Sequence, residues 1–459
     1  MNTILIQQSD NKILYKHLLH NPNQENMAIA FCGVSKTKRK IILIVKEITC
    51  LQSEDLITHT RHGLEIKEDV YREILLKAKA LELSIIVFHS HPFAEKAWFS
   101  SIDDSNDFLH AKFIKNNIPF IYYANVIVSQ KGFKARLFDK RKEKFIEIDE
   151  VKIFGNFSNL KNSSDHLEFD RNYRAFTKPG QDIISSLSIA LVGCGGLGWQ
   201  IAQQLTSLGV GKLLLIDPDK IEKTNLNRLP ALPYSKVGKS KARVLSSILK
   251  RMNPRTKVYY RCKSVHDKNI TNELKDYDII IGAVDSENIR LFLNNFSVKY
   301  LKYYLDAGSE IILDNGKIKH AGGQVNTVIP GTTPCLCCNL LLDYKIISYE
   351  NLDANEKHSE VTGGYIRGIN EPSASIVSIN GVVASSLVNE FIALTTKFTT
   401  PDSYLFFDFL NKEKLMFSVG FKKNDNCLIC GREGIFGYGD IEKQNNSKSL
   451  PSFLQMEGL

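Results

Sequence analysis

A glycine-rich turn between apolar segments constrains the fold of this chain more than any other feature. Gly193-Cys194-Gly195-Gly196-Leu197-Gly198 follows an apolar run over 188–192 and opens a helical pattern over 197–208. A second apolar run, 212–216, comes next, so the predicted order is strand, turn, helix, strand. Strands that alternate with helices favour a parallel sheet covered on both faces, which predicts a doubly wound α/β fold of the Rossmann type.

The glycine spacing also indicates a nucleotide site. Gly193, Gly195 and Gly198, followed by Asp217 about 24 residues after the first glycine, match the dinucleotide fingerprint. Glycines there let backbone N–H groups and a helix N-terminus meet a phosphate. Taken alone, the motif fits an NAD-dependent oxidoreductase equally well. Later residues favour ATP, because phosphate transfer needs cations and a Mg²⁺ ligand. These residues are Asn225, Arg228, Lys241 and, at the end of an apolar run, Asp285.

This set resembles the ThiF/MoeB-type superfamily of ubiquitin-activating enzymes, from Phe169 to about Leu394, including segments 324–335 and 368–372. The resemblance implies that ATP adenylates the C-terminal carboxylate of a ubiquitin-like or sulfur-carrier protein. It assigns Gly195 and Gly196 to the phosphates and Asp217 to the ribose. It further assigns the three residues Asn225, Arg228 and Lys241 to the phosphates, and Asp285 to Mg²⁺.

Two other positions bear on this resemblance. An arginine early in the domain of this superfamily reaches the ATP of a second subunit, and Arg174 fits that role, which implies a homodimer. Leu229 departs from the family, which usually has glutamine there. We expect this change to weaken one contact without abolishing activity.

A histidine pair in the first half of the chain predicts a metal site. Residues 85–88 form an apolar run that leads into His89-Ser90-His91-Pro92. Residues two apart on a strand face the same side, so both imidazoles can hold one ion, and Asp103 supplies an oxygen ligand. These three ligands leave one position of a tetrahedral zinc open for water, whose pKa zinc lowers to about 7. The loop length leaves Ser101 and Asp104 as alternatives to Ser100 and Asp103.

The histidine motif resembles the JAB/JAMM metalloproteases, which cleave ubiquitin-like proteins from their targets. The resemblance covers about the first 140 residues and implies an α/β domain of the cytidine-deaminase-like type. It assigns Glu25, at the start of residues 25–33, as general base, and Ser100 as hydrogen-bond donor to the oxyanion. The alternative is an incidental pair of surface histidines, which is the favoured interpretation of His59 and His62.

Two CxxC pairs predict a second, structural zinc site, because four thiolates close the coordination of the ion. The spacing leaves Cys337 as the spare thiol, and a redox pair is the alternative. The ligands are Cys335, Cys338, Cys427 and Cys430.

The ThiF-like superfamily has thioester-forming members that carry a further cysteine after the first pair, but residues 339–426 contain none. The other thiols, which we expect to be buried, are Cys32, Cys50, Cys194 and Cys262. An adenylate would therefore pass to another acceptor, such as the thiol of a separate conjugating enzyme or a persulfide.

The sequence divides into a metalloprotease-like domain (1–150), a linker (151–168), an adenylating domain (169–435) and a polar tail (436–459). The net charge of +9 is scattered, which argues against nucleic acid. We expect no membrane span and no secretory signal, hence a cytoplasmic protein. The combined prediction is a two-site enzyme using ATP, Mg²⁺ and two zinc ions. The alternatives are an NAD-binding oxidoreductase, an adenylating enzyme for a peptide with a degenerate protease domain, and a scaffold with inactive sites.

Overall fold

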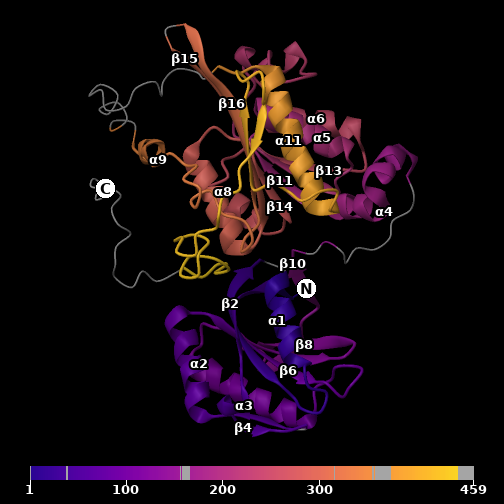
Figure 1. Cartoon of the computed structure of the whole chain (residues 1–459), viewed down its shortest axis with the longest axis vertical. Coiled ribbons are helices and arrows are strands. Elements are labelled where there is room, and N and C mark those ends of the chain that lie inside the picture. Colours follow the sequence, from indigo (N-terminus) through magenta and orange to yellow (C-terminus); the bar gives the residue numbers. More distant parts are fainter. Residues whose placement is uncertain are drawn as a thin grey trace. The chain divides into compact units, whose positions relative to one another are not determined.

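The computed structural model describes residues 2–37, 40–61, 63–155, 157, 166–314, 316–353, 356 and 374–442. They belong to two compact units (Figure 1). Unit 1 comprises Met1–Asn156 together with Gly437–Leu459, and unit 2 comprises Phe157–Phe436. Each unit has its own eight-stranded sheet.

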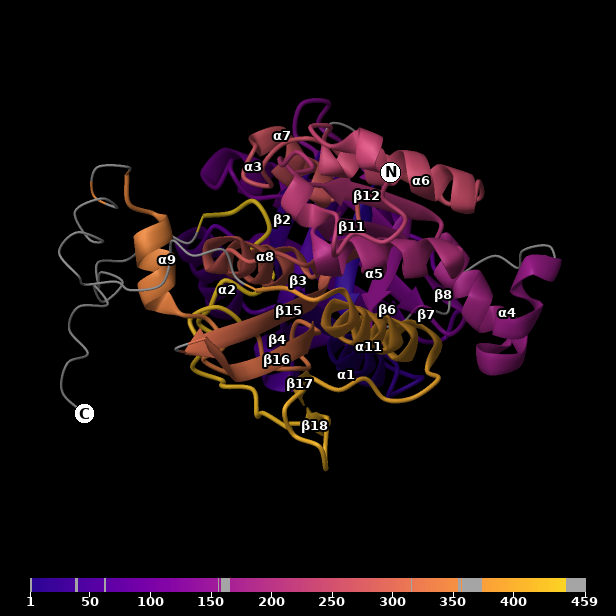
Figure 2. The same cartoon turned by 90° about the horizontal axis from the view of Figure 1, so that it is seen from above.

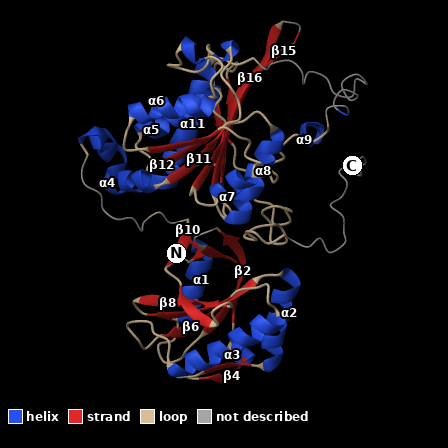
Figure 3. Cartoon of the chain, turned by 180° about the vertical axis from the view of Figure 1, so that it is seen from behind, coloured by secondary structure: helices blue, strands red, loops and turns tan. Residues whose placement is uncertain are grey.

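Unit 1 is built on a mixed sheet with the strand order β10-β1-β3-β2-β6-β7-β8-β9. Helix α1 packs its apolar side chains on one face, and α2 and α3 cover the other (Figure 3). A small hairpin, β4-β5, lies apart from this sheet. The elements are β1 (Thr3–Gln7), α1 (Gln8–Leu18), β2 (Met27–Lys36), β3 (Ile41–Cys50), η1 (Ser53–Asp55), β4 (Leu56–His59), β5 (Leu64–Ile66), α2 (Glu68–Leu81), β6 (Ser84–His91), α3 (Ser101–Asn117), β7 (Tyr123–Ser129), β8 (Gly132–Asp139), β9 (Lys144–Glu147) and β10 (Glu150–Phe154).

The structure differs from the predicted boundaries at the linker. Residues 150–154 form β10, which pairs in parallel with β1, so the first part of the predicted linker (151–168) belongs to the sheet of unit 1. Val151 and Ile153 are two apart on this strand and both pack against the core that α1 covers, which explains the pairing.

The predicted polar tail also differs, because its first residues are an integral part of unit 1. We call residues 437–442 the C-terminal strap. Gly439 forms a parallel bridge with Val34 of β2, and the backbone N–H of Asp440 donates to the Val34 carbonyl over 2.5 Å. The Asp440 carboxylate accepts the backbone N–H of Lys36. Tyr438 is 3% exposed and packs in the core beneath α2 and α3. The strap therefore contributes core to a unit that begins at the other end of the chain.

Unit 2 has the strand order β13-β12-β11-β14-β15-β16-β17-β18. The strands from β13 to β15 are parallel, as predicted, and β16 to β18 add an antiparallel half. Helices α5, α6 and α11 lie on one face and α8 on the other (Figures 1 and 2). The elements are η2 (Leu167–Phe169), α4 (Asp170–Ser186), β11 (Ser188–Val192), α5 (Gly196–Ser207), β12 (Lys212–Ile216), η3 (Lys223–Asn225), η4 (Tyr234–Lys236), α6 (Lys241–Met252), β13 (Lys257–Arg261), α7 (Lys268–Leu274), β14 (Ile279–Gly282), α8 (Glu287–Tyr300), β15 (Tyr303–Asp314), β16 (Lys317–Val328), α9 (Tyr344–Glu350), α11 (Val377–Thr396), β17 (Tyr404–Asp408) and β18 (Met416–Ser418).

Helix α11 corrects the expectation that no segment reaches the length and apolarity of a membrane span. It has 20 residues, and the mean hydropathy over its most apolar stretch of 18 residues is 1.5. The same composition suits a core helix, and α11 packs against α5, β15 and β16. Its apolar character is therefore explained by packing within unit 2.

Candidate functional sites

The first site lies where the strand order of unit 2 reverses. The strands β12 and β14 flank β11 on its two sides, so the connections that leave the carboxyl ends of β11 and β14 diverge at this edge, where sheets of this kind bind ligands. Gly193 follows β11, Asp217 follows β12 and Asp285 comes three residues after β14. The structure thus brings the predicted nucleotide residues to one edge of the sheet.

The glycine loop has a backbone that larger residues could not adopt. Gly193 has a φ of +93°, and a Cβ atom there would overlap the carbonyl oxygen of Ala283. A side chain on Gly198 would meet the carbonyl of Gly193. Around Gly195 the space is open. The loop leads into α5 at Gly196, so unpaired N–H groups of the first helical turn are available to an anion at this edge.

Asp217 is fixed beside this loop. Its side chain is buried and accepts the backbone N–H groups of Cys194 (2.7 Å) and Asp219 (2.8 Å). Burial raises the pKa of Asp217, and these two hydrogen bonds oppose the shift. The carboxylate therefore ties the end of β12 to the glycine loop, the position predicted for a ribose contact.

The predicted cations also lie near the loop. Lys241 begins α6, and its Nζ is 2.8 Å from the Asp219 carboxylate. Arg228 donates to the carbonyl of Thr224 (2.6 Å), and its Cδ would be 3.4 Å from a Cβ on Gly196. Both charges therefore lie at the edge of the sheet that carries the glycine loop.

The other residues predicted for the nucleotide site differ in burial and in their contacts. The Asn225 side-chain oxygen accepts the N–H of Glu222, and Leu229 is buried in the core. Asp285 is exposed. Arg174 lies on α4 and pairs with Asp170, with 72% of its side chain exposed. The family segment predicted over 368–372 lies outside the described residues.

Four thiols of unit 2 converge as predicted. The Sγ atoms of Cys335 and Cys427 are 3.7 Å apart, and those of Cys338 and Cys430 are 3.2 Å apart. All four lie within 4.8 Å of one another, which suits the four thiolates of a structural zinc site. Cys337 is outside this group, with its sulfur 3.7 Å from the Asn294 amide nitrogen.

The other thiols only partly match the expectation of burial. Cys32 and Cys194 are buried and Cys50 is half-buried. Cys262 is exposed, and its sulfur is 2.9 Å from the hydroxyl oxygen of Ser240, so the prediction was wrong for this thiol. It follows directly after β13, where the chain leaves the sheet at its solvent edge.

Residues 169–429 match the model of the ThiF family, which is more than half of the chain. The chain belongs to the ThiF family. Ubiquitin-like modifier-activating enzyme 5 of Gallus gallus is 27% identical over 261 residues, which cover 53% of this chain and 59% of that protein. Adenylyltransferase and sulfurtransferase MOCS3 of Drosophila yakuba is 30% identical over 163 residues, or 36% of this chain and 34% of that protein.

Among solved structures, E. coli MccB with ATP gives a TM-score of 0.47 at 22% identity, and the alignment covers 59% of this chain and 76% of that chain. This chain spans less than two thirds of the length of the curated relatives named above. The ThiF match begins at residue 169, so it does not include the sheet of unit 1.

Unit 1 of this ThiF-family chain carries the second site. His89 and His91 end strand β6 on the same face, and Asp103 lies in the first turn of α3. One Asp103 oxygen is 3.3 Å from Nε2 of His89 and the other is 3.8 Å from Nε2 of His91. Apart from these contacts with Asp103, the described residues offer no hydrogen-bond partner to the buried atoms His89 Nε2 and His91 Nδ1. One ligand atom from each of the two imidazoles and from the Asp103 carboxylate lie within 4.8 Å of one another, an arrangement that fits a zinc ion.

The spacing of Ser100 and Asp103 has a second physical reason. Ser100 is the N-cap of α3, where its Oγ accepts the N–H of Asp103 and its own N–H donates to the Asp103 carboxylate over 2.7 Å. This capping box fixes the carboxylate that faces the histidines. The alternative ligand Asp104 instead pairs with Arg136 and is 60% exposed, and Ser101 is exposed. The structure therefore groups Asp103, and not Asp104, with the histidines.

Glu25 lies next to this cluster, two residues before β2, with its carboxylate 3.7 Å from Nε2 of His91. Burial raises the pKa of Glu25 to about 7, a value suited to a general base near neutral pH. Burial lowers the pKa of His91 to about 4, which keeps its imidazole neutral, the form that binds metal. His59, by contrast, contacts Ser53 and Asn26, and His62 lies outside the described residues.

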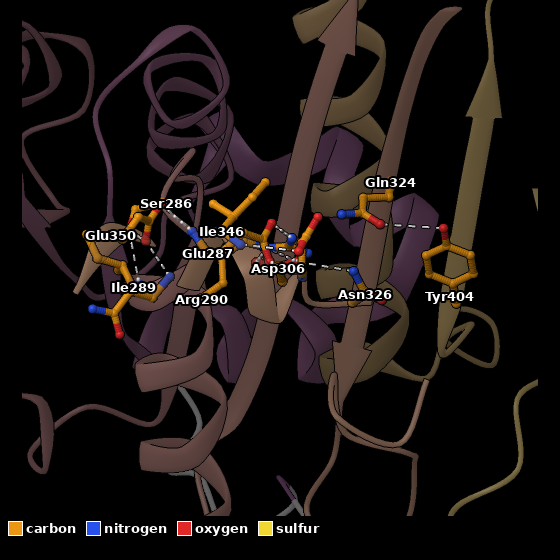
Figure 4. A network of polar contacts seen from close by, with 12 residues as sticks. Ser286, Glu287, Ile289, Arg290, Asp306, Gln324, Asn326, Ile346, Glu350 and Tyr404 are labelled. Atoms are coloured by element: carbon orange, nitrogen blue, oxygen red, sulfur yellow. Dashed lines mark hydrogen bonds and ion pairs between the residues drawn. The ribbon is translucent and has the colours of Figure 1, made fainter. Parts of the chain in front are cut away.

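Sequence reasoning missed a polar network around α8 and β15 (Figure 4). Arg290 of α8 donates to both oxygens of Asp306 of β15, with the shortest contact at 2.7 Å. Glu350 accepts the hydroxyl of Ser286 and the N–H of Asn288, which fixes the start of α8 just after Asp285. The one signal in the sequence was an aspartate inside the apolar run that forms β15.

Proposed function

We propose that this chain is a two-site enzyme that acts on the C-terminus of a ubiquitin-like or sulfur-carrier protein. Unit 2 adenylates the C-terminal carboxylate with ATP, and unit 1 cleaves the peptide or isopeptide bond that follows this C-terminus. The observation that carries the proposal is the glycine loop, set beside Asp217 at the reversal point of a ThiF-family sheet. The similarity to two relatives, a ubiquitin-like modifier-activating enzyme and an adenylyltransferase and sulfurtransferase, supports it.

In unit 2, the substrate carboxylate attacks the α-phosphate of ATP, the bond to the β-phosphate breaks, and pyrophosphate leaves. Gly193, Gly195, Gly196 and Gly198 shape the loop whose N–H groups meet the phosphates. Arg228 and Lys241 offset the charge of the phosphates, and Asn225 contributes an amide. Asp285 would hold Mg²⁺, which shields phosphate charge when bound. Arg174 would act across a homodimer.

In unit 1, a zinc ion held by His89, His91 and Asp103 would lower the pKa of a bound water. Glu25 receives a proton and returns it to the leaving amine. The Ser100 hydroxyl retains its own proton, because its oxygen is the acceptor in the cap, so it can donate to the oxyanion. A second zinc at Cys335, Cys338, Cys427 and Cys430 would be structural.

The fate of the adenylate follows from the cysteines. Residues 339–426, the segment in which thioester-forming members carry their cysteine, contain none. Cys32 and Cys194 are buried and poor nucleophiles, and the exposed Cys262 lies beside Ser240 and outside that segment. The activated carboxylate is therefore transferred to a separate acceptor, such as the thiol of a conjugating enzyme or a persulfide.

The test measures both activities on the full chain. The probes are small β-grasp proteins ending in Gly-Gly, offered for ATP–pyrophosphate exchange and, with a C-terminal peptide extension, for cleavage. We expect Glu25→Ala to keep its zinc but lose cleavage, and Asp285→Ala to lose exchange but retain cleavage. Asp103→Asn should lose the unit 1 zinc, whereas the matched control Asp104→Asn should keep it. A folded single variant that loses both activities would contradict the assignment of two separate sites.

A further inference from the structure

Helix α11 reaches the glycine loop through one buried side chain. Asn380 lies in the first turn of α11 and is 2% exposed. Its amide occupies the space beside Gly196, where a Cβ atom would lie 3.2 Å from Cγ of Asn380 and closer still to Nδ2. We propose that Asn380 is a positioning residue that holds the glycine loop in the conformation that binds the phosphates of ATP. This inference rests on the adenylating function proposed above.

Both ends of the Asn380 amide are used, so its orientation is fixed. Oδ1 accepts the hydroxyl of Ser309 on β15 over 2.8 Å. Nδ2 donates to the hydroxyl of Ser375, just before α11, over 3.0 Å. The amide therefore links the sheet, the approach to α11 and the start of α5. A buried polar group with satisfied partners on both sides has one preferred position, and Gly196 packs against it.

Further contacts hold α11 along α5, so the helix that carries Asn380 is fixed relative to the glycine loop (Figure 2). Gln200 of α5 donates to the carbonyl of Val377 over 3.1 Å, and Gln204 donates to the hydroxyl of Ser385 over 3.1 Å. These bonds run along one seam between the two helices. Because these bonds prevent α11 from shifting along α5, a substitution at Asn380 should change the position of Gly196.

The chemistry explains why an amide is suited to this position. An apolar residue of similar size would leave the hydroxyls of Ser309 and Ser375 without this partner. A carboxylate in place of the amide would add a negative charge beside the loop that receives phosphates, and it could not donate to Ser375. The amide fills the space, satisfies both hydroxyls and carries no charge.

The experiment measures binding of ATP with Mg²⁺, and of adenosine, to the full chain by calorimetry, with unfolding midpoints as the check on folding. Gly196→Ala should weaken ATP binding about tenfold or more, because its Cβ displaces the Asn380 amide. Asn380→Ala alone should also weaken ATP binding, because the loop loses its support. In the double variant with Gly196→Ala, the total loss should be smaller than the sum of the two single losses, because the added Cβ no longer meets the amide. Asn380→Asp should weaken ATP binding and leave adenosine binding unchanged. Gly195→Ala, with open space around it, should gain nothing from Asn380→Ala.

The outcomes separate this inference from the proposed function. If the wild-type chain binds no ATP, both the proposed adenylating function and the role of Asn380 are overturned. If it binds ATP, but Asn380→Ala has no effect or the two single losses simply add in the double variant, only the positioning role of Asn380 is overturned. Unchanged ATP affinity in folded Asn380→Asp overturns it as well. An equal loss of ATP and adenosine binding in Asn380→Asp would indicate a merely structural role and would also overturn it.

Discussion

Replacing Asp306 by alanine should leave the Arg290 guanidinium buried without its main carboxylate partner (Figure 4). The side chains of Arg290 and Asp306 are 5% and 1% exposed, so water cannot replace the lost acceptor. The substitution also removes the acceptor for the hydroxyl of Tyr304 and for the amide of Asn326. Arg290 keeps one contact, since Glu287 accepts from Nη1 over 2.6 Å.

These contacts set the magnitude. Breaking a buried ion pair by removing one partner costs about 3–5 kcal/mol. Because Glu287 still compensates part of the charge, we expect the lower end, about 3 kcal/mol. With a urea slope of about 3 kcal/mol per molar, the unfolding midpoint of unit 2 should fall by about 1 M.

The two tryptophans of the chain provide the assay. Trp98 lies in unit 1 and Trp199 is fully buried in unit 2, so Trp98→Phe leaves one fluorophore that reports on unit 2. Urea unfolding is followed by Trp199 emission in this background, with and without Asp306→Ala. The matched control is Glu168→Ala, which removes an exposed partner of Arg255 and should not move the midpoint.

A double variant separates charge from contact. Asp306→Leu combined with Arg290→Met removes both charges of the pair and should recover part of the lost stability. Glu287 then lacks the guanidinium, but its side chain is 15% exposed and still accepts the N–H of Asp343. A shift below about 0.3 M in Asp306→Ala, or a double variant as unstable as the single one, would refute the argument that an unpaired buried charge dominates the cost.

Two further predictions concern other buried groups. Tyr438→Ala should destabilise unit 1 by about 3 kcal/mol through lost aromatic packing, and amide exchange in β2 should accelerate; unchanged protection there would contradict a structural role of the strap. Burial raises the pKa of Glu390 to about 7 from 4.5, so the folded state binds the proton more tightly than the unfolded state. This contribution to stability is complete below about pH 4.5 and is lost as the pH rises through about 7. Glu390→Gln should therefore stabilise unit 2 at pH 8, by at most about 3 kcal/mol, and an equal pH dependence of unfolding in both proteins would contradict this.

The parts that could be predicted from the sequence are those with a local physical cause. The turn at Gly193 requires a positive φ, which favours glycine. A glycine-rich turn between apolar segments therefore predicted the strand before it, the helix after it and the parallel sheet to which they belong. His89 and His91 share a face because they are two apart on a strand. Helix α11 lacked such a signal, because it is apolar on most of its surface and shows no clear helical period.

Contacts between distant residues could not be predicted in this way, even where the residues themselves were noticed. Ser100 and Asp103 were assigned to catalysis by resemblance, yet their spacing also follows from a helix cap, which became visible only with the geometry of α3. The pairing of Arg290 with Asp306 depends on α8 and β15 lying side by side, and the pattern of neither segment indicates that.

The C-terminal strap is the clearest case of this limit, and it bears on how the two units are linked. Lys36 and Asp440 are 404 residues apart, and the segment around Tyr438 is short, glycine-rich and followed by polar residues, a pattern typical of a tail. Only six residues separate Cys430 of the thiol cluster from Gly437 of the strap. The chain therefore leaves unit 1 after β10, forms unit 2, and returns directly from the thiol cluster to complete the core of unit 1. It follows that the core of unit 1 is complete only when the strap is present, although unit 2 separates the strap from the rest of unit 1 in the sequence.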